Sequence, residues 1–511
     1  MSQLIFEGKQ RDLADLFERG RAVATTLAQE HGVTADSNVL VTLEFSDTAI
    51  EALIAVWLLK ARCVMLPPSC SSTLFGSVLE TFSPQAICVD SHNERLRELL
   101  PGEATLLGDN ADKQVAVART TSHATDAANA SDDTAGELPG TPPDDWHAFL
   151  NDQPEVIFFT SGSTSQAKGV VLEWEKILKK GEAVVTHYQL VPGQRVMPIL
   201  PYSHVYGLYP VLGAFSLGID TIVCRETIAP GEIAQSITRD EANVVICPPL
   251  TAQFLFGRHA PSETVQSQLR VVALGGAAMS PEVLEAIRTN LPHTQLYLSY
   301  GLAETYSTIC CVDVSAEPEC FATVGPARFL AEVEARDPAT GESVAAGEIG
   351  ELCIGGQITS GYYGNEHPRE QYFTTDGWLR TGDLGTVDER GYVSIRGRLK
   401  ETINAGGLSI DPSEIEEVLL AHPLVTDCGV CGLIRNNREF PAAAVVIDTA
   451  ATAGQNNSES ADEAELVKQL FAHCREQLSS KLVPGKIALV DAIPRGALGK
   501  IERATLKKRI E

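Results

Sequence analysis

The sequence predicts an α/β fold in which a large N-terminal domain is followed by a small α+β domain. Residues 38–45 (NVLVTLEF) form a continuous apolar strand pattern, a helix pattern begins after Ser46, and residues 64–66 begin the next strand. A strand–helix–strand unit of this kind has parallel strands, and strands that are apolar throughout are typical of sheets covered on both faces. At 511 residues, the chain is longer than one ordinary domain.

The same alternation continues along the first two-thirds of the chain. Further short apolar runs lie at residues 196–200, 221–224, 244–247, 271–274 and 295–298. Residues 109–145 differ, because they are rich in Ala, Thr, Ser, Asp and Pro and poor in large apolar side chains. This composition predicts an exposed, mobile insertion. Residues 455–462 (QNNSESAD) predict a smaller flexible loop of the same kind.

A change of composition after Asp383 predicts a separate C-terminal domain. A helix begins at Asp411, which is placed as the N-cap, with Pro412 in the first turn and Glu414 three residues after the cap. The remaining strand and amphipathic helix patterns lie at residues 391–397, 425–430, 442–447, 466–478 and 486–490. We expect an N-terminal domain over residues 1–397, a hinge over residues 398–400 and a C-terminal domain over residues 401–511.

The net charge and the cysteine content bear on which partners, compartments and metal sites the protein can have. The net charge of −27 disfavours nucleic acid and anionic membranes as partners. The twelve cysteines are scattered, and the one C-x-x-C pair, Cys428 and Cys431, has no His partners at ligand spacing. This favours free thiols in a reducing compartment over disulfides or a zinc site. No basic, apolar leader opens the chain and no apolar run is long enough to span a bilayer, so we expect a cytoplasmic protein.

One polar loop is a candidate phosphate site. Residues 158–169 (FFTSGSTSQAKG) place a loop rich in hydroxyls and glycine directly after an apolar strand, and Lys168 ends it. Backbone N–H groups, hydroxyls and an ammonium can surround phosphate oxygens. The segment is not a Walker A sequence, and a polar surface turn is the alternative interpretation.

Four further segments place chemistry at strand ends and at the domain junction. Residues 300–305 (YGLAET) follow a strand, so Glu304 lies at a sheet's carboxyl edge, where ligands usually bind. Residues 380–383 (RTGD) place Asp383 after a tight turn, where a carboxylate can accept both ribose hydroxyls. Residues 397–400 (GRLK) suit a hinge, and residues 494–501 (PRGALGKI) present Lys500 from a Gly-rich loop able to enter a cleft.

Taken together and in this order, these segments resemble the adenylate-forming superfamily of acyl-CoA synthetases, peptide-synthetase adenylation domains and luciferase-like enzymes. The resemblance covers nearly the whole chain. It implies a large N-terminal domain that contains sheets and a β-barrel part, and a small mobile C-terminal domain. It also implies ATP and Mg²⁺ as cofactors and a carboxylic acid that is activated as an acyl-adenylate and then transferred to a thiol.

The resemblance assigns a role to each matching residue. Glu304 would bind Mg²⁺, Lys500 would be the lysine that the C-terminal domain inserts for adenylation, and His204 would lie beside the carboxylate pocket. The loop that handles the ATP phosphates would consist of Thr160, Ser161, Gly162, Ser163, Thr164 and Lys168. The other nucleotide contacts would come from Tyr300 near adenine, Thr305, and Asp383 with Arg398 at the ribose. Lys400 matches the hinge, and Gly406 and Gly407 match the thiol tunnel.

Three departures from the family pattern bear on these roles. Ala303 stands where most members have Thr, which removes one phosphate contact that Thr305 or Thr164 could replace. Ala167 replaces a proline in the phosphate loop, which affects its stiffness. Residues 431–441 (CGLIRNNREFP) lack the family's Gly-x-Pro-Asp stretch near the acceptor, which weakens the assignment of CoA.

The acid and the acceptor are only partly specified. Residues 201–204 (PYSH) offer no Asp to hold a substrate ammonium, so we expect a fatty or aryl acid rather than an amino acid. Residues 275–278 (GGAA) are either a roomy pocket floor or a core-packing turn. We expect the acceptor to be a separate molecule, either CoA or the phosphopantetheine of an acyl carrier protein. A luciferase-like monooxygenase and an inactive nucleotide binder are the alternative functions.

Overall fold

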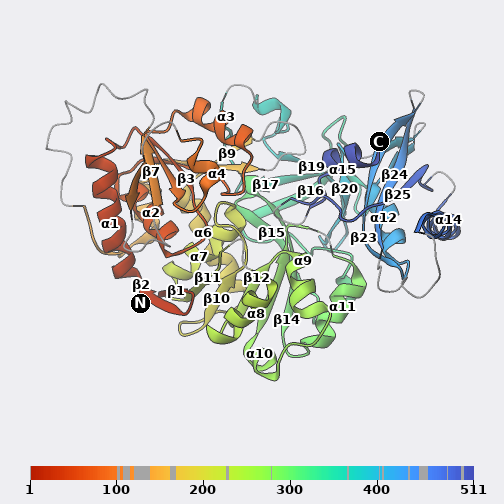
Figure 1. The fold of residues 1–511 in the computed structure, drawn as a ribbon, viewed down its shortest axis with the longest axis horizontal. Helices are drawn as coiled ribbons and strands as arrows, with labels where there is room; N and C mark the ends of the chain where they lie inside the picture. The colour runs from red at the N-terminus through yellow and green to blue at the C-terminus, as the bar shows by residue number, and fades with distance from the viewer. Residues whose placement is uncertain are drawn as a thin grey trace.

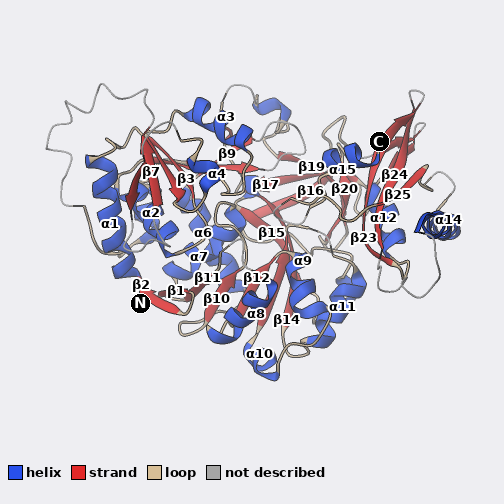
Figure 2. Cartoon of the chain, in the orientation of Figure 1, coloured by secondary structure: helices blue, strands red, loops and turns tan. Residues whose placement is uncertain are grey.

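Figure 1 shows the fold in a computed structural model of the chain. The structure describes residues 2–100, 104–107, 115–119, 138–160, 168–225, 229–277, 279–364, 368–401, 403–405, 408–435, 438–447, 459–479, 482–496 and 500–511. Two eight-stranded sheets and a four-stranded sheet belong to the large N-terminal part, and a smaller lobe follows them. Helices and sheets form layers throughout (Figure 2), which confirms the predicted α/β class with a large and a small part.

The first eight-stranded sheet contains the predicted strand–helix–strand unit. Its central strands are parallel, because β3 pairs with β4 and β5, and β4 pairs with β8. Antiparallel strands complete both edges. The order across the sheet is β18 (Gly361–Tyr362), β9 (Lys168–Leu172), β8 (Val156–Thr160), β4 (Arg62–Met65), β3 (Asn38–Thr42), β5 (Ala86–Asp90), β7 (Val115–Arg119) and β6 (Ala104–Leu107).

The second eight-stranded sheet is also parallel in its centre. Its two edge pairs, β14 with β15 and β1 with β2, are antiparallel. The order is β15 (Ser307–Asp313), β14 (Gln295–Leu302), β13 (Val271–Gly275), β12 (Val244–Cys247), β10 (Arg195–Pro198), β11 (Asp220–Val223), β1 (Gln3–Phe6) and β2 (Lys9–Asp12). The carboxyl ends of β13 and β14 therefore lie at one edge, as ligand sites in open sheets require.

Helices separate and cover the two sheets. Ser46 caps α2 by accepting a hydrogen bond from the Ala49 backbone, as the sequence predicts. The helices of the N-terminal part are α1 (Leu13–Gln29), α2 (Asp47–Leu58), α3 (Ser72–Phe82), α4 (Glu94–Arg97), α5 (Trp146–Asn151), α6 (Trp174–His187), α7 (Val205–Ser216), α8 (Pro230–Arg239), α9 (Pro249–Ala252), α10 (Glu263–Gln268) and α11 (Pro281–Asn290). Residues of both sheets share the main core cluster, so α1, α2, α6 and α7 pack between them.

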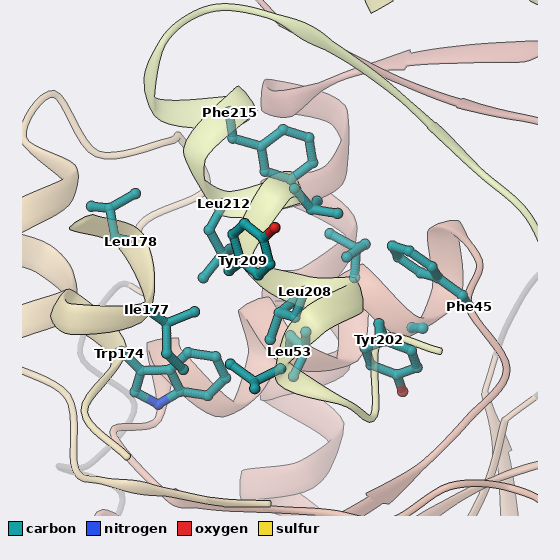
Figure 3. Packing of buried hydrophobic residues seen from close by; sticks show 14 of the residues in the cluster. Phe45, Leu53, Trp174, Ile177, Leu178, Tyr202, Leu208, Tyr209, Leu212 and Phe215 are labelled. Atoms are coloured by element: carbon teal, nitrogen blue, oxygen red, sulfur yellow. The ribbon is translucent and has the colours of Figure 1, made fainter. Parts of the chain in front are cut away.

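The crossing of α6 and α7 is a close backbone contact in this core. A Cβ atom on Gly181 would lie 2.0 Å from the Tyr209 backbone oxygen, and one on Gly213 would lie 2.2 Å from the Gly181 carbonyl carbon. The two helices therefore meet backbone to backbone. Figure 3 shows the large side chains that fill the space around this crossing, including Tyr202 stacked on Phe45 with ring centroids 5.3 Å apart.

An antiparallel sheet follows the second large sheet. Its order is β16 (Ala331–Arg336), β17 (Gly350–Gly356), β19 (Leu379–Val387) and β20 (Val393–Arg398). The resemblance implies a β-barrel part in the N-terminal domain. In the described residues its strands pair in the order just given, and the β-barrel part stays a prediction.

The C-terminal lobe has the predicted α+β composition. Asp411 caps α12 (Pro412–Leu420) by accepting a hydrogen bond from the Ser413 backbone. The other elements are β21 (Ile403–Ala405), β22 (Leu408–Ile410), β23 (Val425–Arg435), β24 (Arg438–Ile447), α14 (Glu459–Gln477), β25 (Lys486–Leu489) and α15 (Arg503–Ile510). In Figure 1 this lobe lies at the right, beside the four-stranded sheet. The exact domain boundaries at residues 397 and 401 stay a prediction.

Two predicted loops are partly ordered elements. Residues 115–119, inside the expected insertion at 109–145, form β7 between β5 and β6, and Val117 is fully buried. Because β7 is hydrogen-bonded to a strand on each side, it can be buried with small side chains. Its composition therefore resembles that of an exposed loop. Residues 459–462 begin α14 instead of continuing a loop, and acidic residues favour a helix's first turn. Residues 109–114, 120–137 and 455–458 lie outside the described residues.

All twelve cysteines are buried and free, as their scattered spacing predicts. In the parts of the chain that the structure describes, no helix is both long and apolar enough to cross a membrane.

A buried lysine connects the helix layer to the four-stranded sheet. Lys180 of α6 is fully buried, and its Nζ donates a 2.5 Å hydrogen bond to the Phe329 carbonyl. Phe329 and the next residue, Leu330, both have left-handed φ values, 53 and 65. Burial lowers the pKa of Lys180 to about 7, although Cys310 acts in the opposite direction. The lysine thus holds the turn that leads into β16.

We predict that Lys180 makes stability depend on pH. Because its folded pKa of about 7 lies below the ordinary 10.5, the unfolded chain binds more protons between these values, and raising the pH stabilises the fold. From pH 7 to pH 9 this contribution grows by about 2 kcal/mol. Lys180→Met cannot titrate at this position. Its free energy of unfolding, measured by thermal unfolding, should therefore rise less than that of wild type from pH 7 to pH 9. The exposed Lys179→Met is the control, and parallel pH curves for Lys180→Met and wild type would contradict the assignment.

Candidate active site

The predicted phosphate loop is held at both ends by one strand pair. Thr160 is the last residue of β8 and Lys168 the first of β9, and the two are directly paired in antiparallel register. The residues between them, including Ser161, Gly162, Ser163 and Thr164, lie outside the described residues. Their anchoring fixes where the loop leaves the sheet and where it returns.

Glu304 lies on a short 3-10 helix (Ala303–Thr305) that follows β14. Its Oε1 accepts a 2.8 Å hydrogen bond from Tyr362 Oη, and its backbone oxygen accepts a 2.7 Å bond from the Thr359 N–H. Lys168 Nζ lies 5.1 Å from the Tyr362 ring centroid and 4.1 Å from that of Tyr372. The structure therefore brings Lys168 and Glu304, which are distant in sequence, to the same tyrosine.

The hydroxyl of Thr305 is used within the turn itself. Thr305 is fully buried, and its Oγ1 accepts from the Leu302 N–H at 3.1 Å and donates to the Ser307 carbonyl at 2.8 Å. The Thr305 hydroxyl thus closes the turn that presents Glu304, and its expected contact with the nucleotide stays a prediction.

Asp383 is a buried carboxylate with two strong partners. It is 4% exposed, accepts a 2.7 Å hydrogen bond from Tyr300 Oη and lies 3.0 Å from Arg398 Nε. Burial and the neighbouring Asp383 raise the pKa of Tyr300 well above its usual range, so the phenol stays protonated as a donor. Burial acts to lower the pKa of Arg398, but Asp383 and Glu401 outweigh it and raise the value. Tyr300, predicted near adenine, therefore forms one cluster with Asp383 and Arg398, which are predicted at the ribose.

Lys500 is presented by a small hairpin of the C-terminal lobe. Arg495 bridges to Ile501, and the Gly496 N–H donates a 2.8 Å bond to the Lys500 carbonyl. Burial and the charge of Arg398 lower the pKa of Lys500, whereas Asp383, Glu304 and Glu401 act to raise it. Lys500 keeps solvent-exposed surface, while its ammonium interacts electrostatically with groups of the clusters around Glu304 and Asp383.

His204, in the helix layer, is influenced by the charge of Lys500. It is the N-cap residue of α7, and its pKa is lowered to about 4 by burial and by the positive charge of Lys500. At neutral pH the imidazole is therefore uncharged. Within the described residues, its buried Nε2 has no hydrogen-bond partner, so this nitrogen is available to a ligand.

Arg503 anchors the Lys500 hairpin to the segment after the hinge, and sequence reasoning missed it. Its Nε lies 2.8 Å from Glu401 Oε2 and its Nη1 lies 2.5 Å from Glu416 Oε1. Burial acts to lower its pKa, but Glu416 and Glu401 raise it. Lys400 lies in an exposed turn beside Glu401. Gly406 and Gly407, the predicted thiol tunnel, lie outside the described residues.

Tyr206 of α7 limits the space beside Gly275. A Cβ atom on Gly275 would lie 2.4 Å from Tyr206 Oη and 2.6 Å from Ser299 Oγ. Close packing therefore explains this glycine, as one of the two interpretations of residues 275–278 expects. Sequence reasoning did not identify Tyr206 and Tyr362 as candidate site residues. Their only sequence signal is that each tyrosine stands next to a glycine.

Comparison with known proteins agrees with this geometry. The family model described as AMP-binding enzyme matches residues 2–363, and the model of the AMP-binding enzyme C-terminal domain matches residues 414–500. The chain belongs to the AMP-binding enzyme family. Members of this family form the adenylate-forming superfamily, and the chain is an enzyme similar to its AMP-forming acid–thiol ligases.

Relatives of the AMP-binding enzyme family span different activities. 4-Coumarate--CoA ligase-like 4 of Oryza sativa subsp. japonica is 30% identical over 425 residues, 81% of this chain and 71% of that protein. 2-Succinylbenzoate--CoA ligase of Bacillus velezensis is 25% identical over 508 residues, 99% of this chain and 94% of that protein. Luciferin 4-monooxygenase of Photuris pensylvanica is 30% identical over 374 residues, 71% of this chain. That match spans 65% of the Photuris protein, less than two thirds of its length.

The fold of the family is shared with solved structures. ATP-bound MatB from Rhodopseudomonas palustris superposes with a TM-score of 0.80 at 22% identity, over 99% of this chain and 95% of that chain. The o-succinylbenzoate coenzyme A synthetase of Bacillus subtilis, solved with ATP and a magnesium ion, gives a TM-score of 0.76 at 24% identity, over 99% and 97%.

We predict that Asp383→Asn weakens ATP binding at least about tenfold. The amide cannot balance the Arg398 guanidinium, and hydrogen bonds to charged groups contribute about 1.5–3 kcal/mol. Calorimetric titration with ATP measures the affinity. Tyr300→Phe, which removes one donor and keeps the ion pair, should lose less. Equal ATP affinity in Asp383→Asn and wild type would remove Asp383 from the nucleotide site.

Proposed function

We propose that this enzyme uses ATP to activate a carboxylic acid without an α-amino group and then transfers the acyl group to a thiol, CoA in the first instance. The observation that carries the proposal is that Lys500, presented by the small lobe, interacts electrostatically with Glu304, Asp383, Arg398 and His204 of the large lobe and the predicted hinge. A lysine from the small lobe would thus serve a nucleotide site built by the large lobe. The buried thiols fit a reducing compartment such as the cytoplasm.

The nucleotide would lie between the phosphate loop and Asp383. Thr160 and Lys168 fix the ends of the loop, and the Asp383 carboxylate can accept the ribose hydroxyls beside Arg398 and Tyr300. The solved MatB structure of the same fold holds ATP, which supports ATP as the nucleotide.

Glu304 fits a magnesium site. Mg²⁺ in nucleotide enzymes is commonly held by one or two carboxylates together with substrate phosphates and water, and Glu304 supplies one carboxylate held by Tyr362. When bound, Mg²⁺ neutralises charge on the phosphate oxygens. The Bacillus subtilis synthetase solved with ATP and a magnesium ion has the same fold.

The first half-reaction needs charge neutralisation rather than a base. The substrate carboxylate is already ionised, and its oxygen attacks the α-phosphorus, forming a C–O–P bond while the bond to pyrophosphate breaks. The negative charge of ATP opposes this attack, and Lys500 would neutralise the charge that develops on the phosphoryl oxygens and the leaving pyrophosphate. His204, uncharged at neutral pH, would lie beside the carboxylate without adding a second positive charge.

The second half-reaction needs a different arrangement of the lobes. The acyl-adenylate is a mixed anhydride, and a thiol sulfur attacks its carbonyl carbon with AMP as the leaving group. Rotation about Lys400 would withdraw Lys500 and bring the segment of Gly406 and Gly407 to the site, a hinge transition of a common kind. Lys400 lies in the exposed turn next to Glu401, where a chain can rotate.

CoA is favoured as the acceptor by the relatives, several of which are named CoA ligases. The second candidate is the phosphopantetheine of a separate acyl carrier protein, which the absence of the Gly-x-Pro-Asp stretch in residues 431–441 favours. The acid is fatty or aryl, because residues 201–204 supply no carboxylate for an ammonium. Tyr206 beside Gly275 restricts its bulk.

The proposal is tested by MgATP-dependent pyrophosphate release across a panel of fatty, aryl and amino acids, with and without CoA. We expect release with one class of non-amino acid and a strong increase on addition of CoA. Slow release that CoA does not change, but that a phosphopantetheinylated carrier protein increases, would support the second candidate. ATP binding without release across the whole panel would contradict the proposal and favour an inactive binder, and acid-dependent oxygen uptake or light would favour a monooxygenase.

We predict that Lys500→Ala lowers the rate of adenylate formation by a factor of at least about 10². Thiolation of a supplied acyl-adenylate should stay largely intact. The reason is that the lysine neutralises charge only in the first half-reaction. Pyrophosphate release and acyl-thioester formation measure the two steps separately. Lys508→Ala, an exposed lysine of α15 in the same lobe, should leave both unchanged. Equal loss of both steps in Lys500→Ala would contradict the two-arrangement mechanism.

A further inference from the structure

Tyr362 lies at the junction of the two segments that would handle the ATP phosphates and the metal. It belongs to β18, which pairs with β9 so that Tyr362 lies opposite Val170, two residues after Lys168. The same segment contacts Glu304 twice, through the Thr359 N–H to the Glu304 carbonyl at 2.7 Å and through Tyr362 Oη to its carboxylate at 2.8 Å. The Thr359 hydroxyl also donates to the Val171 carbonyl of β9 at 2.6 Å.

The hydroxyl of Tyr362 can act only as a donor to Glu304 at physiological pH. Tyr362 Oη donates to the carboxylate at 2.8 Å, and a phenol keeps its proton at neutral pH because its ordinary pKa is about 10. A neutral donor leaves the carboxylate ionised and fixes its orientation. By contrast, an arginine or lysine partner would cancel the charge that a cation needs.

The ring of Tyr362 acts on Lys168. The Lys168 ammonium lies 5.1 Å from its centroid and 4.1 Å from the Tyr372 centroid, and the two rings are 4.5 Å apart at an angle of 59°. Aromatic faces attract a cation without neutralising it. The lysine is therefore held in place with its charge available to an anion.

We propose that Tyr362 is a positioning residue that sets Glu304 and, together with Tyr372, Lys168 in one fixed geometry for a metal–nucleotide complex. This inference rests on the proposed function, in which Glu304 holds the metal and Lys168 contacts the phosphates. The hydroxyl of Tyr362 orients Glu304, which would bind the metal. The rings of Tyr362 and Tyr372 hold Lys168, which would contact the phosphates. The two roles can be separated by mutation.

The test is metal binding by the full-length protein in the presence of a non-hydrolysable ATP analogue. Mn²⁺ is the probe, because its free electron paramagnetic resonance signal disappears on binding. Tyr362→Phe keeps the ring and removes the hydroxyl, and we expect its Mn²⁺ affinity to fall about fivefold to tenfold. Affinity for the analogue in EDTA should stay unchanged. Tyr372→Leu should show the reverse pattern, with weaker analogue binding in EDTA.

Tyr363→Phe is the matched control. The neighbouring Tyr363 stacks on Phe82 with centroids 4.2 Å apart, away from Glu304, so loss of its hydroxyl should change neither affinity. The double variant Tyr362→Phe, Glu304→Gln should bind Mn²⁺ no more weakly than Glu304→Gln alone, because Tyr362 acts through Glu304. Thermal unfolding verifies that every variant is folded.

Two outcomes would overturn the inference, and they are distinguishable. Mn²⁺ binding by Tyr362→Phe at wild-type affinity, or additive losses in the double variant, would overturn this inference alone. A wild-type protein that binds neither the ATP analogue nor Mn²⁺ would overturn the proposed function together with it.

Discussion

The Lys500 ammonium must be partly removed from water to reach the site, and the rest of the site is arranged around that cost. Burial and Arg398 oppose its charge, whereas Asp383, Glu304 and Glu401 favour it. Each of these carboxylates is held by its own partner: Asp383 by Tyr300, Glu304 by Tyr362, and Glu401 by Arg503. A partly desolvated charge is tolerated where opposite charges and hydrogen bonds compensate it, and the proposed role of Lys500 in adenylation requires this compensation.

This arrangement also explains why the site is built from three sheets rather than one. Glu304 follows β14 of the second large sheet, Lys168 begins β9 of the first, and Asp383 lies on β19 of the four-stranded sheet. Tyr362 joins the first pair, and Tyr300 joins the second large sheet to β19. The fold holds these sheets in place through the helix layer, in which α6 and α7 touch at Gly181 and Gly213 and Lys180 reaches the turn before β16.

Local sequence predicts what depends on local chemistry. The apolar strand at β3, the Ser46 cap of α2 and the Asp411 cap of α12 follow from periodicity and capping. By contrast, β7 could not be predicted from local composition, because pairing on both sides buries a strand of small side chains. The use of the Thr305 hydroxyl within its own turn also became visible only in the structure. Tyr362 and Arg503 could not be predicted from spacing, since each acquires its role from partners 58 and 102 residues away. The motifs thus indicated the chemistry, and the tertiary contacts that orient it became visible only in the structure.

The contact between Arg503 and Glu401 has a mechanical consequence. It joins the first residue after the hinge to the helix at the other end of the lobe, 102 positions later, and Arg503 also binds Glu416 of α12. These contacts cross-link the lobe, so a rotation at the predicted hinge would reach the Lys500 hairpin through Arg503 as well as through β23, β24 and β25. In the proposed two-arrangement mechanism the lobe would then turn as one stiff body, and the rotation would be taken up by the few bonds around Lys400.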